Sequence, residues 1–491
     1  MTTDTKADTK AATKAAAASA ASAADPGVRL ADYMRAHLGA YFLGAATLAC
    51  FQLAMNRVDW LSKTAIDIIF GRAPGKVPGD AAWPALGMLL LALVAFVTRV
   101  ASRWFSFNAG RDPERLALKF RNMRSDPFVF LRATCHLFYR RLPELPDSPA
   151  VWCCGDLHLQ NFGSYKGDNR LVYFDLNDFD EGVLAPASWD LVRFLTSVRV
   201  GAESMGVKDK DASALCAAFL DAYREKLLTG KAGWVEREIA DGLVRDLLAG
   251  LHGRLRPAFL DGRTVKKGKQ RRLRLDNGKV LPASDAQKEW VTKLIGTLAE
   301  AQANPEFYEV LDVARRIAGN GSLGVDRFAI LVRGKGSPDD NYLLDLKEAQ
   351  PSSLLPRLKT PQPAWKSEAV RVVEIQRRMQ AVSMAFLQPV QVGKRAYVLR
   401  ALQPTEDRVV LDQSRSSFEA IAGAVHTMGR IVASAQLRSG GRDGSAIADA
   451  LIAFGAGAWR KDLLAAAEAC AAQLQADWKT YCQAYDDGAF A

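Results

Sequence analysis

Two uncharged apolar runs near the amino terminus constrain this chain more than any other feature, because such runs must be withdrawn from water. They cover residues 38–56 and 81–98. Each is close to the ~20 residues that a helix needs to cross the hydrocarbon core of a bilayer. A buried core helix is the alternative, chiefly for the first run, which contains Thr47 and Gln52. We expect two transmembrane helices with a short external loop over residues 31–105.

The charges around these runs predict their orientation. Lysine and arginine are frequent before the first run and after the second, whereas aspartates dilute the basic residues of the loop between them. By the positive-inside rule, both ends of this segment lie in the cytoplasm. The seven cysteines have no C-x-x-C spacing, which agrees with reduced thiols in the same compartment. We therefore expect a protein of the cytoplasmic membrane whose catalytic domain faces the cytoplasm.

The rest of the chain is predicted to be an α+β protein preceded by a disordered tail. Residues 1–30 are mostly small and polar, and cannot bury enough surface to fold. Helical apolar spacing dominates residues 106–312 and 411–491, and we expect the second of these segments to pack on the first. Residues 313–410 contain strand-like runs such as "FAILVRG" and "RAYVLRALQ" around one helix, which predicts a β-rich lobe.

The stretch "CCGDLHLQNFG", residues 153–163, places an aspartate, a histidine and an asparagine directly after a short apolar run. Two chemistries use such a string: a phosphoryl-transfer loop of the form D-x-x-x-x-N, and a metal site that begins D-x-H. A binuclear metal hydrolase takes about eight ligands. The chain has five histidines in all, and the others lie outside any ligand motif. Ligand supply therefore favours phosphoryl transfer.

In kinase-type enzymes a loop aspartate accepts the proton of the attacking hydroxyl, and an asparagine binds a metal ion. Asp156 and Asn161 have this spacing. The run "VYFDLNDFD" supplies Asp175 at the end of a predicted strand, where it can hold Mg²⁺ against nucleotide phosphates. It also supplies Asp178 and Asp180 as further carboxylates. Carboxylates on a solvated loop are the alternative interpretation.

A glycine-rich segment lies downstream, in "RIAGNGSLGVDRFAILVRG". Gly319, Gly321 and Gly324 have G-x-G-x-x-G spacing, with Ser322 among them and strand-like residues on both sides. Glycine lets backbone N–H groups approach phosphate oxygens closely. The same spacing occurs in dinucleotide folds, so the pattern is weak by itself. We expect this segment to bind the nucleotide.

The residues after the glycines complete a kinase-like set. "NYLLDLKEA" places Lys347 inside a strand, as in the V-A-I-K motif of kinases, and the next helix offers Glu374 as its partner, with Glu368 as second choice. An edge-strand lysine facing water is the alternative. Because Lys347 would hold phosphates whose Mg²⁺ is bound by Asp175, we expect the two to lie close in space. Here the catalytic loop precedes the glycines, which predicts a circularly permuted, two-lobed kinase-like fold.

The series "GDLHLQN", "VYFDL" and "SWDLVRF" resembles the GDLHPGN, IDW and DLA series of aminoglycoside and choline phosphotransferases, which are distant relatives of protein kinases. The resemblance implies that Asp156 is the catalytic base and that Asn161 and Asp175 are metal ligands. It also implies that Asp190 is a helix aspartate that braces the catalytic loop. Leu176 stands where that series has a tryptophan.

With "RSDPFVFLR", "CGDLHLQNFG", "FDLNDFDE", "GSLG" and "LLDLKEA", approximately residues 112–440 resemble the bacterial family known as domain of unknown function 2252. That family is bacterial and is grouped with protein-kinase-like proteins, so the resemblance implies ATP and Mg²⁺ as cofactors, and the apolar hairpin then predicts a bacterial inner membrane as the location. Gln436 replaces an expected histidine, which bears on acceptor choice if that histidine shapes the substrate pocket. The apolar hairpin is not part of the usual pattern.

The densest basic cluster, "RTVKKGKQRRLR" at residues 263–274, is expected in a polar loop that contacts an anionic lipid or an acidic substrate. A solvated loop is the alternative, and nucleic acid is disfavoured because no aromatic residue interleaves the charges. The sequence thus predicts a membrane-anchored, ATP- and Mg²⁺-dependent phosphotransferase of unknown acceptor. The alternative is a nucleotide-binding pseudokinase that acts as a membrane signalling or scaffold protein.

Overall fold

The computed structural model describes residues 52, 57–58, 60–70, 72–88, 90–91, 112–276, 278–403 and 407–490. The chain divides into two compact units, Met1–Arg111 and Asp112–Ala491. In the first unit, residues 60–69 and 82–88 are helical, and the short 3-10 helix η1 (Pro78–Ala81) precedes the second of these segments. The predicted disordered tail, residues 1–30, lies outside the described residues.

The predicted transmembrane hairpin is corrected by the structure. None of the helices in the described ranges is both long enough and apolar enough to span a bilayer. The described helix at residues 60–69 lies between the two apolar runs. It includes the charged residues Lys63 and Asp67, so it is not an uncharged span. The first run, residues 38–56, lies outside the described residues except for Gln52, and the second is described only at residues 81–88 and 90–91. The predicted membrane orientation and location rested on this hairpin.

The second unit has the α+β composition that the sequence predicts. Capping residues explain where helices begin: Asp126 accepts hydrogen bonds from the backbone N–H groups of Phe128 and Val129, with Pro127 in the first helical position. The helices outside the largest sheet are α4 (Pro113–Ser125), α5 (Pro127–Ala133), α6 (Cys135–Arg140), α7 (Ala187–Val200), α8 (Asp209–Leu228), α9 (Gly242–His252), α10 (Arg256–Asp261), α13 (Phe418–Ser439), α14 (Ala448–Ala456) and α15 (Arg460–Asp486).

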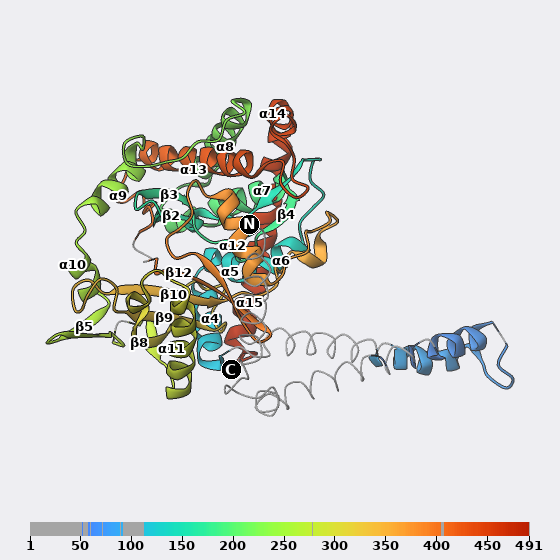
Figure 1. The fold of residues 1–491 in the computed structure, drawn as a ribbon. Coiled ribbons are helices and arrows are strands. Elements are labelled where there is room, and N and C mark those ends of the chain that lie inside the picture. Colours follow the sequence, from blue (N-terminus) through green and yellow to red (C-terminus); the bar gives the residue numbers. More distant parts are fainter. Residues whose placement is uncertain are drawn as a thin grey trace, which may run out of the picture. The chain divides into compact units, whose positions relative to one another are not determined.

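Short antiparallel strand pairs lie among these helices. They are β1 (Ala150–Cys153) with β4 (Val183–Pro186), β2 (Phe162–Lys166) with β3 (Val172–Leu176), and β5 (Thr264–Lys267) with β6 (Gln270–Leu273). The carboxyl-terminal helices pack on the earlier ones, α13 against α8 and α15 against α7, and Figure 1 shows α13 running beside α8. The predicted catalytic loop, residues 154–161, leaves β1 and enters β2 through the 3-10 helix η2 (Leu159–Asn161); it is called the catalytic loop below for this predicted role.

The largest sheet has six antiparallel strands in the order β11-β12-β10-β9-β8-β7. Their bounds are β7 (Val280–Pro282), β8 (Val310–Arg316), β9 (Arg327–Val332), β10 (Tyr342–Glu348), β11 (Gln388–Val392) and β12 (Arg395–Ala401). Helices α11 (Asp285–Glu300) and α12 (Glu368–Met379) belong to the same part of the chain. The sequence predicts that the β-rich lobe starts at residue 313. In the structure the sheet starts earlier in the chain, at β7.

The two faces of this sheet have different neighbours because side chains alternate along a strand. On β9, Phe328, Ile330 and Val332 face the cluster that includes Val291 and Ile295 of α11. Figure 1 shows α11 beside β8 and β9. Ala329 and Leu331 point to the opposite face, where they join another cluster with Leu343 of β10 and Leu260 of α10. By the same alternation, Asp345 and Lys347 of β10 lie on this opposite face.

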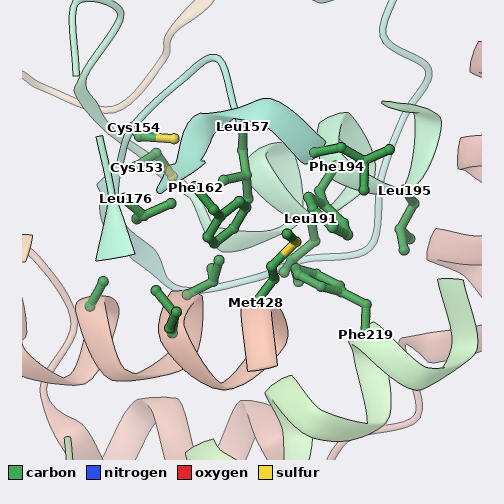
Figure 2. Packing of buried hydrophobic residues seen from close by; sticks show 14 of the residues in the cluster. Cys153, Cys154, Leu157, Phe162, Leu176, Leu191, Phe194, Leu195, Phe219 and Met428 are labelled. Atoms are coloured by element: carbon green, nitrogen blue, oxygen red, sulfur yellow. The ribbon is translucent and has the colours of Figure 1, made fainter. Parts of the chain in front are cut away.

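A third and larger hydrophobic cluster lies beneath the catalytic loop. Cys154, Leu157 and Phe162, which alternate with the polar residues of the loop, are buried in it. Figure 2 shows these side chains packed with residues of α7, α8 and α13. The rings of Phe194 and Phe219 stack with their centroids 3.9 Å apart. The apolar residues of the motif thus anchor the loop in the core, and the side chain of Asp156 is left partly exposed.

Candidate functional site

Asp190 fixes the backbone at the start of the catalytic loop. It lies in the first turn of α7, and its two carboxylate oxygens accept hydrogen bonds from the N–H groups of Cys154 (2.9 Å) and Gly155 (3.0 Å). Burial raises the pKa of Asp190 to about 6, and the two hydrogen bonds oppose that shift. Gly155 has φ +81°, and a Cβ there would lie 2.2 Å from the carbonyl oxygen of Glu181. The predicted bracing role of Asp190 is confirmed.

Asp156, the expected base, is held by an arginine that the sequence reasoning did not single out. Its Oδ1 accepts from Arg193 Nε (3.1 Å) and Nη2 (2.6 Å). Arg193 lies one turn after Asp190 on α7, is fully buried, and also donates to the carbonyl oxygen of Leu131 (2.8 Å). Among the described residues no donor hydrogen-bonds the other oxygen, Oδ2, which is 4.0 Å from His158 Nε2. One oxygen of Asp156 is therefore fixed, and the other is available to a substrate.

His158 contributes no positive charge to this site. Burial lowers its pKa well below the ordinary 6.5, and the nearby cations Arg132, Arg193 and Arg408 lower it further. The imidazole is therefore neutral at neutral pH. Its Nδ1 accepts a hydrogen bond from the N–H of Gln160 (3.1 Å), which shapes the loop between the aspartate and the asparagine.

Asn161 ties the catalytic loop to the turn after β3. Its Nδ2 donates to the carbonyl oxygens of Asp156 and Asp178, both at 3.1 Å. Its Oδ1 accepts from the N–H of Asp178 (2.8 Å) and of Asn177 (3.3 Å). The structure thus brings Asn161 together with Asp156 and Asp178, as the sequence predicts. The side-chain oxygen that would bind a metal is, however, hydrogen-bonded to the protein backbone.

Asp175 does not join this group. It is a buried residue of β3, paired with Gly163 of β2, and its carboxylate accepts from the N–H groups of Leu176 (2.8 Å) and Ala381 (3.1 Å). Burial raises its pKa, and Arg438 opposes the shift. The buried carboxylate of Asp175 therefore points toward the segment after α12. The expected closeness of Lys347 to Asp175 is not supported by any hydrogen bond or salt bridge among the described residues, and Lys347 lies beside other aspartates of the same run.

Asp178 and Asp180, beyond the end of β3, are those aspartates. Lys347 forms a salt bridge with Asp180, although 167 positions separate the two residues. Asp178 is exposed to solvent; desolvation by the protein atoms around its carboxylate raises its pKa, but Lys347 and Arg400 outweigh this and lower it overall. The region therefore holds two carboxylates beside Lys347.

Lys347 itself is a buried lysine, 4% exposed. Burial lowers its pKa, Asp178 and Asp156 act to raise it, and Arg400 acts to lower it. In the register of the sheet it pairs with Arg327 on β9 and Val398 on β12, so β10 is an inner strand. The alternative of an edge-strand lysine facing water is thereby excluded.

Glu374 is not the partner of Lys347. It forms a salt bridge with Arg377 on the same helix (3.2 Å), and Glu368 forms one with Arg371 (2.6 Å). The register of α12 leaves Glu374 at a partly exposed edge and buries Arg371 instead. Arg371 donates to three backbone carbonyl oxygens, those of Asp180 (2.8 Å), Gly182 (2.6 Å) and Gln350 (2.9 Å). Through this arginine the helix holds in place the aspartate loop, residues 177–182, which joins β3 to β4.

The glycine segment forms the loop between β8 and β9, as its flanking strand-like residues predict. Gly319 and Gly324 have positive φ values, +71° and +91°, in the region that favours glycine. A Cβ at Gly321 would lie 3.0 Å from the carbonyl oxygen of Arg132, and Lys119 Nζ donates to the carbonyl oxygen of Gly321 (3.2 Å). The loop is therefore packed on α4 and α5.

Ser322 stays within this loop, where its hydroxyl donates to the carbonyl oxygen of Ala318 (3.4 Å). Its neighbour Asn320 accepts from Asn122 of α4 (3.1 Å). Neither residue contacts the catalytic loop through a hydrogen bond in the described part of the chain. The structure gives the predicted phosphate-binding glycines a defined place and leaves their role untested.

A buried ion cluster lies beside Lys347 on the same face of the sheet. Asp345, two residues earlier on β10 and fully buried, pairs with Arg327 (2.6 Å), Arg316 (3.0 Å) and Arg400 (3.4 Å). Three arginines surround one carboxylate, so the cluster carries an excess of positive charge next to the aspartate loop. Because side chains alternate along β10, the sequence could have shown that Asp345 lies on the same face as Lys347. In the same way, the i,i+3 spacing from Asp190 on α7 could have shown that Arg193 lies beside it.

The residues that fit Mg²⁺ best are Asp178 and Asp180. Magnesium is usually held by one or two carboxylates together with substrate phosphates, and not by a complete protein cage. No group of three or more His, Cys, Asp or Glu side chains within the described ranges is arranged to hold a metal ion. The exposed, ionised Asp178 has the donor chemistry required.

Two other predicted features lie away from this group. The basic cluster forms the β5–β6 hairpin, in which buried Arg271 pairs with Asp261 (2.6 Å) and Asp339 (2.7 Å), and Lys266 also pairs with Asp339 (2.9 Å). Part of its charge is therefore neutralised within the protein. Gln436 is buried in α13, where its Oε1 accepts from the hydroxyl of Tyr223 (2.5 Å), so it occupies a core position.

The family model described as "Uncharacterized protein conserved in bacteria (DUF2252)" matches residues 111–484. No curated protein and no solved structure matches the chain. The matched segment contains the catalytic loop, the aspartate loop, the glycine segment and Lys347, and coincides with the second compact unit. The chain belongs to this bacterial family.

Proposed function

We propose that this member of the DUF2252 family is a kinase-like phosphotransferase that uses ATP and Mg²⁺. The observation that carries the proposal is the salt bridge between Lys347 of the six-stranded sheet and Asp180 of the loop that follows β3. It brings a buried strand lysine to two acidic residues beside the candidate base, Asp156. Kinases assemble the same groups around nucleotide phosphates.

The order of elements in the sheet supports this proposal. The strands β8 and β9 are joined by the glycine loop, β10 follows with Lys347, and α12 comes next. In protein kinases a glycine-rich loop, a lysine on the third strand and a helix follow one another in the same way. Here these elements come after the catalytic loop in the sequence, which agrees with a circular permutation of a kinase-like arrangement.

In the proposed reaction, Oδ2 of Asp156 accepts the proton of an acceptor hydroxyl while Arg193 holds Oδ1. The hydroxyl oxygen forms a bond to the terminal phosphorus of ATP, and the bond from that phosphorus to the bridging oxygen breaks, which releases ADP. Lys347 binds the phosphates of the nucleotide. Asp178 and Asp180 would hold Mg²⁺, which when bound neutralises charge on the phosphate oxygens.

One difference from ordinary kinases follows from the contacts of Lys347. Its partner is Asp180, a residue of the aspartate loop, and not the helix glutamate. Binding of a nucleotide would therefore bring phosphate oxygens to Lys347 in competition with Asp180. The carboxylate released in this way would become available to Mg²⁺, so that nucleotide and metal bind together.

A nucleotide-binding pseudokinase is the second candidate, and a specific observation favours it. Asn161 and Asp175, two of the three metal ligands expected from the sequence, are both hydrogen-bonded to backbone N–H groups. A site with fewer free ligands would bind nucleotide and still fail to transfer phosphate. Retention of Asp156 with a free oxygen favours the enzyme over this alternative.

The full-length protein, incubated with Mg²⁺ and γ-labelled ATP, tests the proposal. We expect ATP hydrolysis or autophosphorylation, and we expect nucleotide binding to be lost in Lys347→Met. Lys394→Met is the matched control, because Lys394 is exposed at the turn between β11 and β12 of the same sheet. Binding without turnover would favour the pseudokinase, and absence of nucleotide binding in the wild type would refute both candidates.

A further inference from the structure

Two arginines converge on one neutral oxygen next to the candidate base. Arg132, at the end of α5, donates from Nη1 to Oε1 of Gln160 (2.7 Å), and Nη1 of Arg408 approaches the same oxygen (3.4 Å). Gln160 belongs to the catalytic loop, four residues after Asp156. Within the described part of the chain, neither guanidinium has a carboxylate at salt-bridge distance, so an uncharged amide oxygen is all that the two cations share.

Both arginines are positioned by contacts of their own. Asp407, the residue before Arg408, accepts from Arg254 through both carboxylate oxygens (2.6 and 2.9 Å), and its carbonyl oxygen accepts from the N–H of Ser164 on β2 (2.9 Å). The side chain of Arg408 then lies across Gly163, where a Cβ would be 3.5 Å from its Cγ. This arrangement holds the guanidinium over the end of the catalytic loop.

Arg132 is fixed from the other side. Its Nε lies 3.2 Å from Nε2 of the neutral His158, and its carbonyl oxygen lies against Gly321 of the glycine loop. Burial and the like-charged neighbour Arg132 together lower the pKa of Arg408 to about 10. Asp178 acts favourably on both arginines, but neither has a carboxylate at salt-bridge distance among the described residues, so the two guanidinium groups repel one another and an anion bound between them would reduce that repulsion.

The chemical class of the anion that would bind between Arg132 and Arg408 follows from their hydrogen-bond donors. A guanidinium presents planar N–H donors that match the oxygen pairs of phosphate and carboxylate groups, and such charge-assisted bonds are among the strongest in proteins. The two groups flank Gln160, on the catalytic loop that carries Asp156. An anion held there would adjoin the site of phosphoryl transfer, which Lys347 enters from the sheet.

We propose that Arg132 and Arg408 form an anion-binding subsite, separate from Lys347, that takes a phosphate or carboxylate group beside Asp156. This inference rests on the proposed phosphotransferase function and deepens it. The same chemistry has two sources: the terminal phosphate of the nucleotide, or an anionic group on the acceptor molecule. In the second case the acceptor is an acidic or phosphorylated compound that also carries the hydroxyl to be phosphorylated.

Titration calorimetry of the full-length protein with inorganic phosphate tests the subsite without any nucleotide. We expect Arg132→Gln and Arg408→Gln each to weaken phosphate binding about tenfold or more, as loss of a charge-assisted hydrogen bond does. Arg415→Gln is the matched control, because Arg415 is an exposed arginine with its own partner, Asp412. Arg408→Lys keeps the charge without the planar fork, and we expect a smaller loss.

A second titration, with a non-hydrolysable ATP analogue and Mg²⁺ already bound, separates the sources. Phosphate that still binds beside the analogue identifies the acceptor's anionic group. Exclusion of phosphate by the analogue, with weaker analogue binding in Arg132→Gln, identifies the nucleotide's terminal phosphate. Failure of the analogue to bind refutes the proposed function and leaves the phosphate result interpretable. Phosphate affinity that is unchanged in folded Arg132→Gln and Arg408→Gln, or no phosphate binding in the wild type, overturns the subsite.

Discussion

The identity of the partner of Lys347 can be tested by comparing Asp180→Asn with Glu374→Gln. Removing one member of a fully buried ion pair costs about 3–5 kcal/mol, because the other charge is left uncompensated. Lys347 is 4% exposed, but the side chain of Asp180 is 33% exposed and Asp178 remains nearby. Solvent and the second carboxylate reduce the cost, so we expect Asp180→Asn to lower the free energy of unfolding by about 1–3 kcal/mol.

Glu374→Gln removes a salt bridge of a different kind. The side chains of Glu374 and Arg377 are 37% and 41% exposed, and pairs of this kind contribute about 0.5 kcal/mol or less. The two variants make the same chemical change, from carboxylate to amide, at the two positions that compete for the role. We therefore expect Asp180→Asn to cost more stability than Glu374→Gln, by about 0.5–3 kcal/mol.

Urea denaturation at pH 7, with the slope of each transition compared, gives the two free energies. A double-mutant cycle then isolates the interaction: in a Lys347→Met background, Asp180→Asn should cost much less than in the wild type, whereas the small effect of Glu374→Gln should not change. An effect of Glu374→Gln as large as that of Asp180→Asn, or one that depends on Lys347, would show that the assignment of Asp180 as the partner is wrong.

Three further predictions follow from the site. Asp156→Asn should reduce turnover about a hundredfold or more while nucleotide affinity, measured by calorimetry, is kept; unchanged turnover would remove Asp156 from the mechanism. Asp190→Asn turns an amide NH₂ toward one of the two loop N–H groups, so urea denaturation should show a loss of about 1–3 kcal/mol. Asp345→Asn leaves three buried arginines without their carboxylate, which should cost about 3 kcal/mol at pH 7. Burial disfavours ionised Asp345, but Arg316 and Arg327 hold its pKa below the ordinary 3.8. Its stabilising effect is therefore complete above that value and lost as the pH falls through the lower folded pKa, so the gap between wild type and Asp345→Asn should narrow at pH 3. A gap that stays constant with pH would contradict this.

Local patterns in the sequence identified the parts of the site that depend on neighbouring residues. The short strand before Asp156 and the loop that joins two strands at Gly319 to Gly324 were predicted in this way, whereas the bracing role of Asp190 came from the family resemblance. The strand and the loop are each specified within a few residues, by strand alternation or by glycine at a positive φ. The α+β class follows from the same patterns.

Long-range side-chain geometry decided the rest. Asp175 and Asp178 are three positions apart in the same acidic run, and only the packing of β3 against the segment after α12 buries one and exposes the other. Likewise, the sequence of α12 contains Glu368 and Glu374 as candidate partners for Lys347, but the rotation of the helix against the sheet directs Arg371 inward.

The apolar runs near the amino terminus are a second case in which sequence composition did not determine the structure. Their composition satisfies the length rule for a bilayer, yet none of the described helices in that region meets the requirement for a span. Composition states how much apolar surface must be removed from water. Which side chains meet, and what covers that surface, is fixed by contacts between residues far apart in the chain, such as Lys347 and Asp180, and these form only when the whole unit packs.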